Sequence, residues 1–158
     1  MLIQKRQYSW VFKTDNDIDY LVNFEKANHH FTDFLPFLNI FELSIELQNE
    51  VQLPPLDLRI EKTIIEVIRK LFDNNTNSLL YICDNLDGRH FARARKFNNW
   101  FGDHNDGTFE KYDEKVIIKN DADDILSYMP VSLILHTQNP YKSQILNIFN
   151  NQIDTYNK

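Results

Sequence analysis

Residues 40–84 constrain the fold more than any other part of the chain. Apolar and polar residues alternate in IFELSIEL (40–47), which predicts a strand that points Glu42 outward. Apolar residues at helical spacing follow over 58–73, and SLLYICD (78–84) is nearly all apolar, as in a strand buried on both faces. A strand, a crossover helix and a second strand form a right-handed parallel unit. We therefore predict that strands 40–47 and 78–84 are parallel neighbours joined by a helix.

The flanking segments predict further strands and helices around this unit. Alternation on both sides of a DND turn indicates a hairpin near the N-terminus, and Asn139-Pro140 is typical of a helix start. The remaining predicted strands cover 8–14, 18–24, 108–118 and 131–137, and the remaining helices cover 88–101 and the segment after Pro140. The order is therefore β-β-β-α-β-α-β-β-α, an α+β fold with a mixed, mainly antiparallel sheet and one parallel βαβ unit. The expected core includes Ile64, Ile68, Leu80, Phe97 and Phe101.

Composition favours one soluble globular domain over residues 1–158. Hydrophobic residues make up 42% of the chain and charged residues 25%, which is ordinary for a folded domain. Cys83 is the single cysteine and ends an apolar run, so we expect a buried thiol, no internal disulfide and a cytoplasmic location. No segment approaches the ~20 apolar residues that span a membrane, and MLIQKRQYSW holds no signal-peptide core, so no membrane partner is expected.

The charge distribution is the most unusual feature of the chain. Its net charge of −6 argues against a protein that coats nucleic acid as a whole. Residues 88–101 nevertheless carry +4 and no acid, through Arg89, Arg93, Arg95 and Lys96. Residues 102–124 follow with eight acids against three lysines. Two interpretations stay open: the two segments neutralise each other within the fold, or the basic helix meets a negative surface on another molecule.

A helix over 88–101 places most of these positive charges on one side. At 100° per residue, one stripe combines three cations with an indole, and the adjacent stripe suits the core. The first stripe holds Arg89, Arg93, Lys96 and Trp100, and the second holds His90, Ala94, Phe97 and Phe101. The first stripe is typical of a basic-aromatic contact face for an anionic partner, with its cations facing solvent and Trp100 partly exposed. The alternative is a solvated face whose cations pair with the acidic segment while Trp100 packs under a loop.

A second candidate site lies where the predicted parallel strands end. Both crossover helices start at that edge of the sheet, and open α/β sheets tend to bind ligands there. The topology would gather Asp57, Arg59, Asp84, Asp87, Arg89 and Arg93. Helix N-termini and arginine side chains suit an anion or a phosphate group. In the alternative interpretation, Asp57 and Asp87 cap helices and the arginines pair with Asp84.

No motif in the sequence specifies a reaction. His29, His30 and His104 lack metal-ligand spacing and no cysteine joins them, so no metal site is predicted. The three glycines form no phosphate loop, so no cofactor is predicted and catalytic residues stay unknown. We therefore expect a binding or accessory protein of unknown role, with the oligomeric state left open.

Most of the chain resembles a bacterial family that is catalogued as a domain of unknown function. The segments that carry the resemblance are YSWVFKTDNDIDYLVNF, IFELSIEL, PPLDLRIEKTIIEVIRKLF, LLYICDNLDGRHFARARKFNNWF and DGTFEKYD. This resemblance implies no activity and assigns no role to the candidate residues.

The element order is also similar to the later part of the N-acetyltransferase (GNAT) fold. That resemblance implies acyl-coenzyme A binding where the central parallel strands splay apart, with a glycine-rich loop on the pyrophosphate. The matching stretch here, LPPLDLRIEKT, has no glycine, and its two prolines remove N–H donors. A diverged acyltransferase is therefore the second functional hypothesis. Nucleic-acid binding through residues 88–101 is the third, and the charge of −10 on the rest of the chain argues against it.

Overall fold

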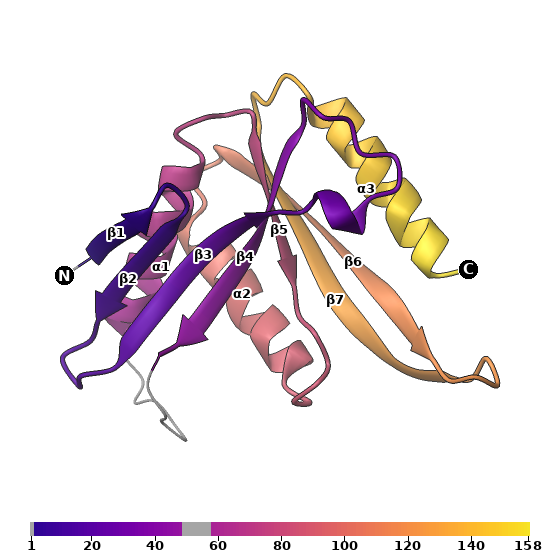
Figure 1. Ribbon diagram of the computed structural model, residues 1–158, viewed down its shortest axis with the longest axis horizontal. Helices are drawn as coiled ribbons and strands as arrows, with labels where there is room; N and C mark the ends of the chain where they lie inside the picture. Colours follow the sequence, from indigo (N-terminus) through magenta and orange to yellow (C-terminus); the bar gives the residue numbers. More distant parts are fainter. Residues whose placement is uncertain (1, 49–57) are drawn as a thin grey trace.

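The computed structural model describes residues 2–48 and 58–158, which form a seven-stranded sheet and three α-helices (Figure 1). The strands lie in the order β1-β2-β3-β4-β5-β7-β6. In chain order the elements are β1 (Leu2–Arg6), β2 (Ser9–Lys13), β3 (Asp19–Lys26), the 3-10 helix η1 (Asn28–His30), β4 (Asn39–Leu47), α1 (Leu58–Leu71), β5 (Asn77–Ile82), α2 (His90–His104), β6 (Phe109–Lys119), β7 (Ile125–His136) and α3 (Lys142–Tyr156). The predicted α+β class and element order are confirmed, with one strand more at the N-terminus.

The parallel pair at the centre of the sheet positions the rest of the molecule. β4 and β5 pair in parallel from Asn39 opposite Asn77 to Glu42 opposite Leu80, and α1 joins them as the predicted crossover. The other neighbouring strand pairs in the described residues are antiparallel. Among the described residues, β4 pairs only with β3 beyond Glu42, and β5 pairs only with β7 beyond Leu80. The two central strands therefore diverge into a wedge, which is visible in Figure 1.

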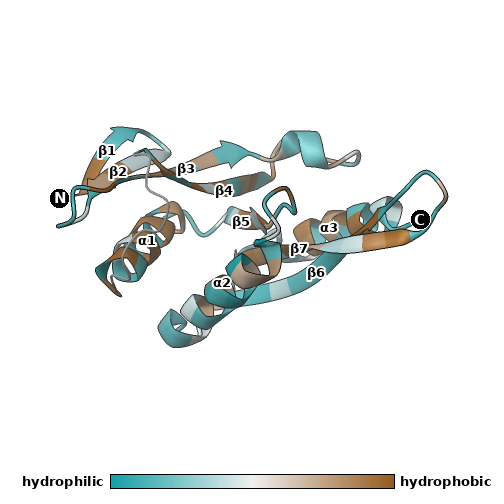
Figure 2. Cartoon of the chain, turned by 90° about the horizontal axis from the view of Figure 1, so that it is seen from below, coloured by the Kyte–Doolittle hydropathy of each residue, from teal (hydrophilic) through white to brown (hydrophobic). Residues whose placement is uncertain are grey.

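Helices cover both faces of the sheet (Figure 2). α1 and α2 lie on one face, and α3 lies on the other. Four of the five predicted core residues are buried, and the fifth, Phe101, is half-buried. Ile64, Ile68 and Phe97 belong to the core under α1 and α2, whereas Leu80 belongs to the core under α3. The C-terminal helix therefore covers part of the sheet face that alternation in β4 assigned to solvent.

Three differences from the expected elements exceed two residues. β1 escapes prediction because four of its five residues, in LIQKR, are exposed and carry no inward pattern. β7 begins at Ile125 rather than at 131, because β6 pairs with it along this length and the Pro130 carbonyl accepts the Cys83 N–H at 3.0 Å. α2 continues through Gly102 to His104, and the Asn105 N–H closes the last turn on the Phe101 oxygen at 2.9 Å.

Two further expectations concern Cys83 and membrane association. Cys83 is free and buried, as its apolar surroundings in the sequence predict. Among the helices of the described ranges, none has the length and apolar character that crossing a membrane requires.

Candidate functional site

The charged residues before and within α2 hold the β5–α2 loop together. Arg93 Nη1 donates a hydrogen bond to Asp87 Oδ2 at 2.7 Å, and Nη2 donates to the Asp84 backbone oxygen at 2.6 Å. The bond between Arg93 and Asp87 lowers the pKa of Asp87 and raises the pKa of Arg93. Asp84 Oδ1 also accepts the Leu86 N–H, and Asp87 Oδ1 accepts the Arg89 N–H. The structure brings Asp84, Asp87 and Arg93 together, and these residues use their charges and hydrogen-bonding groups on one another.

Arg59 is engaged at a different part of the sheet. Its guanidinium pairs with Asp15, in the turn between β2 and β3. With Phe12 and Thr63, Arg59 lines a pocket of about 200 Å³. Asp57, the expected cap of α1, lies outside the described residues.

The expected exposure of Trp100 is wrong. Its side chain keeps only 9% of its surface exposed and packs in the core under α1 and α2. The reason is angular: Trp100 lies about 60° around the helix from Phe97, within the ~100°-wide arc that a packed helix buries. Arg89 and Lys96 are exposed, and Lys96 Nζ lies 5.2 Å from the centre of the indole ring. The stripe of Arg89, Arg93, Lys96 and Trp100 therefore presents no exposed aromatic ring.

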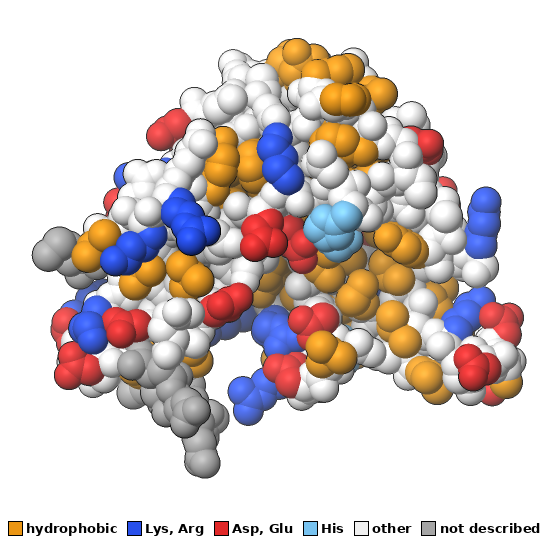
Figure 3. Space-filling view, in the orientation of Figure 1, with side chains coloured by type: hydrophobic (Ala, Val, Ile, Leu, Met, Phe, Trp, Pro, Cys, Tyr) orange, Lys and Arg blue, Asp and Glu red, His pale blue; other side chains and the backbone are white. Residues whose placement is uncertain are grey.

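A pocket of about 280 Å³ opens on the opposite face of the sheet, beneath α3. It lies where the central strands separate, since Glu42 and Leu80, the last residues of the parallel pair, both line it. Its apolar lining comes from Phe31, Leu80, Ile82, Val116, Met129, Val131, Phe149 and Ile153. Figure 3 shows hydrophobic side chains gathered on this face, next to a histidine at the position of η1. The floor is thus formed by strands and one wall by α3.

The polar groups of this pocket lie together at one end. His30 Nε2 lies 2.7 Å from Glu42 Oε2, and the hydrogen bond with His30 lowers the pKa of Glu42. Gln152 is only 6% exposed, and its Oε1 accepts hydrogen bonds from Thr32 N–H at 2.9 Å and from Thr32 Oγ1 at 3.3 Å. Its Nε2 has no hydrogen-bond partner among the described residues. Tyr156 Oη donates to the His30 backbone oxygen at 3.3 Å, so α3 holds η1 in place.

Sequence reasoning missed this pocket because its walls come from distant segments. The chain after β3 returns across β4, where the Ala27 N–H donates to the Ile40 oxygen at 2.9 Å, and His30 thereby meets Glu42. Alternation correctly separates Glu42 from the inward residues of β4, but only the packing of α3 reveals a covered space on that side. The sequence did contain one sign of the covered sheet face. The helix after Pro140 has an apolar side, and such a side packs against another element.

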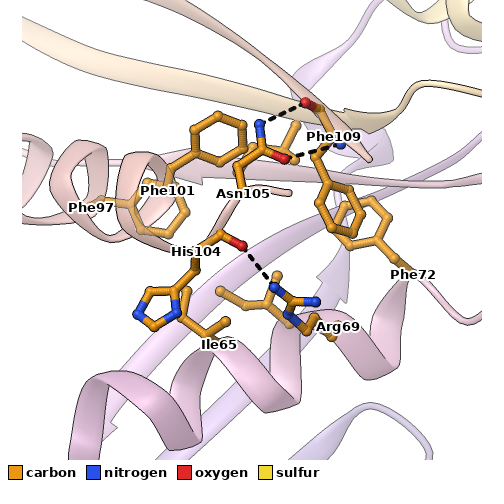
Figure 4. A pocket seen from close by; sticks show the side chains of 10 residues that line it. Ile65, Arg69, Phe72, Phe97, Phe101, His104, Asn105 and Phe109 are labelled. Carbon is orange, nitrogen blue, oxygen red and sulfur yellow. Dashed lines mark hydrogen bonds between the residues drawn. The ribbon is translucent and has the colours of Figure 1, made fainter. Parts of the chain in front are cut away.

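A smaller pocket lies between α1 and α2 (Figure 4). Phe97, Phe101 and Phe109 line it, and Arg69 Nη2 donates to the His104 backbone oxygen at 2.7 Å beside it. Its volume is about 40 Å³, close to the ~30 Å³ that one molecule occupies in liquid water. The space is therefore a small gap in the packing of two helices and is too small for an organic ligand.

Comparison with known proteins gives a family but no described activity. A protein-family model described as "Family of unknown function (DUF6169)" matches residues 56–151, more than half of the chain. No curated protein and no solved structure matches the chain. The matched residues include β5, β6, β7 and most of α3, and they exclude His29 and all four polar residues of the pocket, which are His30, Glu42, Gln152 and Tyr156.

Proposed function

This chain belongs to the DUF6169 family of unknown function, and we propose that it binds a small molecule with an apolar body and an oxygen-containing head in the pocket beneath α3. One observation carries the proposal. The pocket of about 280 Å³ is apolar except at one end, where it is lined by His30, Glu42, Gln152 and Tyr156. Small-molecule sites in proteins have this composition, because the apolar lining supplies affinity and a few polar groups orient the ligand.

The volume limits the size of the ligand. The pocket is about twice the ~150 Å³ of a cavity that holds one benzene molecule. A chain of about eight carbon atoms with a small head therefore fits, whereas a nucleotide would fit only in part. At roughly 0.4 kcal/mol per non-hydrogen atom, a ligand of about ten such atoms binds with a Kd of ~1 mM. Octanamide has this size and is a suitable probe.

The polar end favours a neutral oxygen acceptor as the head group. Gln152 offers its Nε2 as a donor at the pocket, because Thr32 occupies its Oε1. Glu42 has a lowered pKa and is ionised near neutral pH, so a carboxylate head would lie beside a second negative charge. That repulsion costs about 1–4 kcal/mol at ~4 Å, depending on how strongly water screens it. An amide carbonyl accepts the bond from Gln152 without this cost.

Ligand-observed NMR titrations with octanamide, octanoate and octylamine test both the pocket and the head group. We expect octanamide to bind with a Kd of ~1 mM and octanoate to bind more weakly. Octylamine measures the contribution of Glu42, because its ammonium group is attracted to that carboxylate and it lacks the acceptor that Gln152 requires. Ile82→Trp fills the pocket from β5 and should abolish binding, whereas Ile125→Trp makes the same change at an exposed position outside the pocket.

The titrations can refute either part of the proposal. Octanamide binding that survives Ile82→Trp, or that is lost equally with Ile125→Trp, rules out the pocket as the binding site. Tighter binding of octanoate than of octanamide to metal-free protein contradicts the assigned head group.

A diverged acyltransferase is the second candidate function. The divergence of β4 and β5 beyond Glu42 and Leu80 supports it, because the GNAT-like resemblance implies acyl-coenzyme A binding between splayed central strands. The prolines in LPPLDLRIEKT count against it, since they remove donors that a pyrophosphate would need. Saturable binding of acetyl-coenzyme A in calorimetry would favour the acyltransferase. Absence of such binding would eliminate it.

An anionic partner for α2 has less support. Arg93 is occupied by Asp87 and Trp100 is buried, so the exposed cations Arg89, Arg95 and Lys96 lack the indole that the hypothesis requires. Nucleic-acid binding through α2 has less support for the same reason. The single buried thiol of the chain is consistent with a cytoplasmic location, which we propose for this protein.

A further inference from the structure

We propose that His29, His30 and Glu42 bind a divalent transition-metal ion of the zinc type at the polar end of the pocket. In the part of the chain that the structure describes, each of these residues places a possible ligand atom within 4.8 Å of the other two. Two imidazoles and one carboxylate suit Zn²⁺, whereas Ca²⁺ and Mg²⁺ prefer oxygen ligands. Three protein ligands leave the fourth position of a tetrahedral ion open.

The distances permit coordination after small side-chain rotations. Zinc–ligand bonds of ~2.0–2.1 Å in a tetrahedron place the ligand atoms ~3.3 Å apart. His30 Nε2 and Glu42 Oε2 are 2.7 Å apart, so an ion would widen this spacing slightly. The centres of the His29 and His30 rings are 4.0 Å apart, and the His29 side chain is exposed and free to turn toward a shared ion.

The backbone that carries these donors is fixed from both sides. Tyr156 Oη binds the His30 oxygen, and the Ala27 N–H binds the Ile40 oxygen, so η1 is tied to α3 and to β4. Phe31, directly after η1, is buried in the core under α3. A metal site needs such support, because ligands that are already positioned lose little freedom when the ion binds.

A cation at this position would also offset an unfavourable contact within the sheet. Glu25 of β3 and Glu42 of β4 are directly opposite in the antiparallel register, so their side chains emerge on the same face. Like charges in such a pair destabilise the strands. A divalent ion bound to Glu42 would reduce this repulsion, which favours the occupied form of the site.

An ion at this site would change the head group that the pocket prefers. Because His30 and Glu42 line the pocket, an ion bound to them lies at its polar end. A carboxylate head could then take the open coordination position and would no longer face an uncompensated Glu42. With Zn²⁺ present, octanoate should therefore bind more tightly than octanamide. This consequence depends on the proposed function, whereas metal binding itself does not.

Titration of untagged, metal-free protein with Co²⁺, followed by visible absorption, tests the metal site directly. We expect one Co²⁺ per chain, displaced by Zn²⁺. His29→Ala and Glu42→Gln should each weaken binding at least about 10-fold, the loss that removal of even an outer-shell partner causes. His104→Ala is the matched control, because His104 also contacts a carboxylate, Glu61 at 2.8 Å, but belongs to no such three-residue group within the described ranges.

Several results would overturn the metal site. These are no Co²⁺ binding by the wild type up to ~1 mM, equal affinity in the His29→Ala variant, or an equal loss in the His104→Ala variant. Circular dichroism verifies that each variant is folded, and the exposed position of His29 makes its truncation the safest of the three. Co²⁺ binding without octanamide binding supports the metal site and refutes the pocket ligand. Octanamide binding without Co²⁺ binding supports the pocket ligand and refutes the metal site.

Discussion

Truncation of Leu79 and Leu80 tests whether the space beneath α3 is an open pocket. The two leucines are consecutive on β5, are 0% and 2% exposed, and belong to opposite cores. Both positions pair with β4 on one side and β7 on the other, so their backbone environments match. Only Leu80 lines the pocket of about 280 Å³.

The two substitutions should differ in the energy of the cavity they leave. Each Leu→Ala change removes three carbon atoms, worth about 2.4 kcal/mol at ~0.8 kcal/mol per methylene. An enclosed cavity adds roughly 24 cal/mol for each Å³ that does not collapse, so Leu79→Ala should cost about 3–5 kcal/mol. Leu80→Ala enlarges a space that already communicates with solvent, so its cavity contribution is smaller and the total should be about 2–3 kcal/mol.

Urea unfolding followed by circular dichroism measures both losses, and an unchanged slope with denaturant shows that the two-state comparison holds. We expect Leu79→Ala to lose about 1–2 kcal/mol more than Leu80→Ala. A Leu80→Ala loss equal to or larger than the Leu79→Ala loss would show that the space is sealed and would refute the open pocket. A loss below about 1 kcal/mol would show that Leu80 is not packed in the core at all.

Three further predictions concern other parts of the molecule. Burial raises the pKa of the Cys83 thiol, so a disulfide reagent near pH ~8 should label native protein much more slowly than urea-unfolded protein; equal rates would mean that the thiol is accessible. The hydrogen bond from Arg93 lowers the pKa of Asp87 below its usual 3.8, so this contact stabilises the fold above that value and is lost as the pH falls through the lowered pKa. The stability difference between wild type and Arg93→Ala should therefore shrink in acid unfolding series, and a constant difference would contradict the pair. Trp10 and Trp100 are both buried, so acrylamide should quench native fluorescence far less than unfolded fluorescence, and strong native quenching would place an indole at the surface.

The sequence predicts the centre of the fold well because few alternatives exist there. A helix between IFELSIEL and SLLYICD permits essentially one connection, and the observed β4–β5 pair follows it. β1 is different, because LIQKR is held at the sheet edge by backbone pairing with β2, which leaves little pattern in the side chains. For Trp100, the sequence predicts the position around the helix but not the burial. Helical spacing gives its angle, but the width of the buried arc depends on the elements packed around α2.

The candidate site could be predicted only in part. The charge pattern led to the prediction that Asp84, Asp87 and Arg93 lie together, and they do. Their hydrogen bonds, however, are made to one another in the loop before α2. The pocket requires η1 to fold back on β4 and α3 to cross the same sheet face, and these are long-range contacts. His30 and Gln152 lie 122 positions apart, yet both line the pocket. No local spacing rule connects such residues.

Truncation of His29 separates a functional role from a structural role for the polar end of the pocket. A structural role needs the bonds from Tyr156 to His30 and from Thr32 to Gln152, which tie η1 to α3. His29 takes no part in them, since its side chain is exposed and its ring contacts that of His30.

His29→Ala should therefore leave the free energy of unfolding within about 0.5 kcal/mol of the wild-type value, as surface substitutions do. The same change removes one of three proposed ligand atoms, so the affinity for Co²⁺ should fall at least about 10-fold. Urea unfolding and the Co²⁺ titration on the same two proteins measure both effects. A loss of stability with unchanged Co²⁺ affinity would show that the histidine pair serves packing. If neither quantity changes, any Co²⁺ that binds does so elsewhere, because an ion held by His29, His30 and Glu42 cannot be indifferent to the loss of one imidazole.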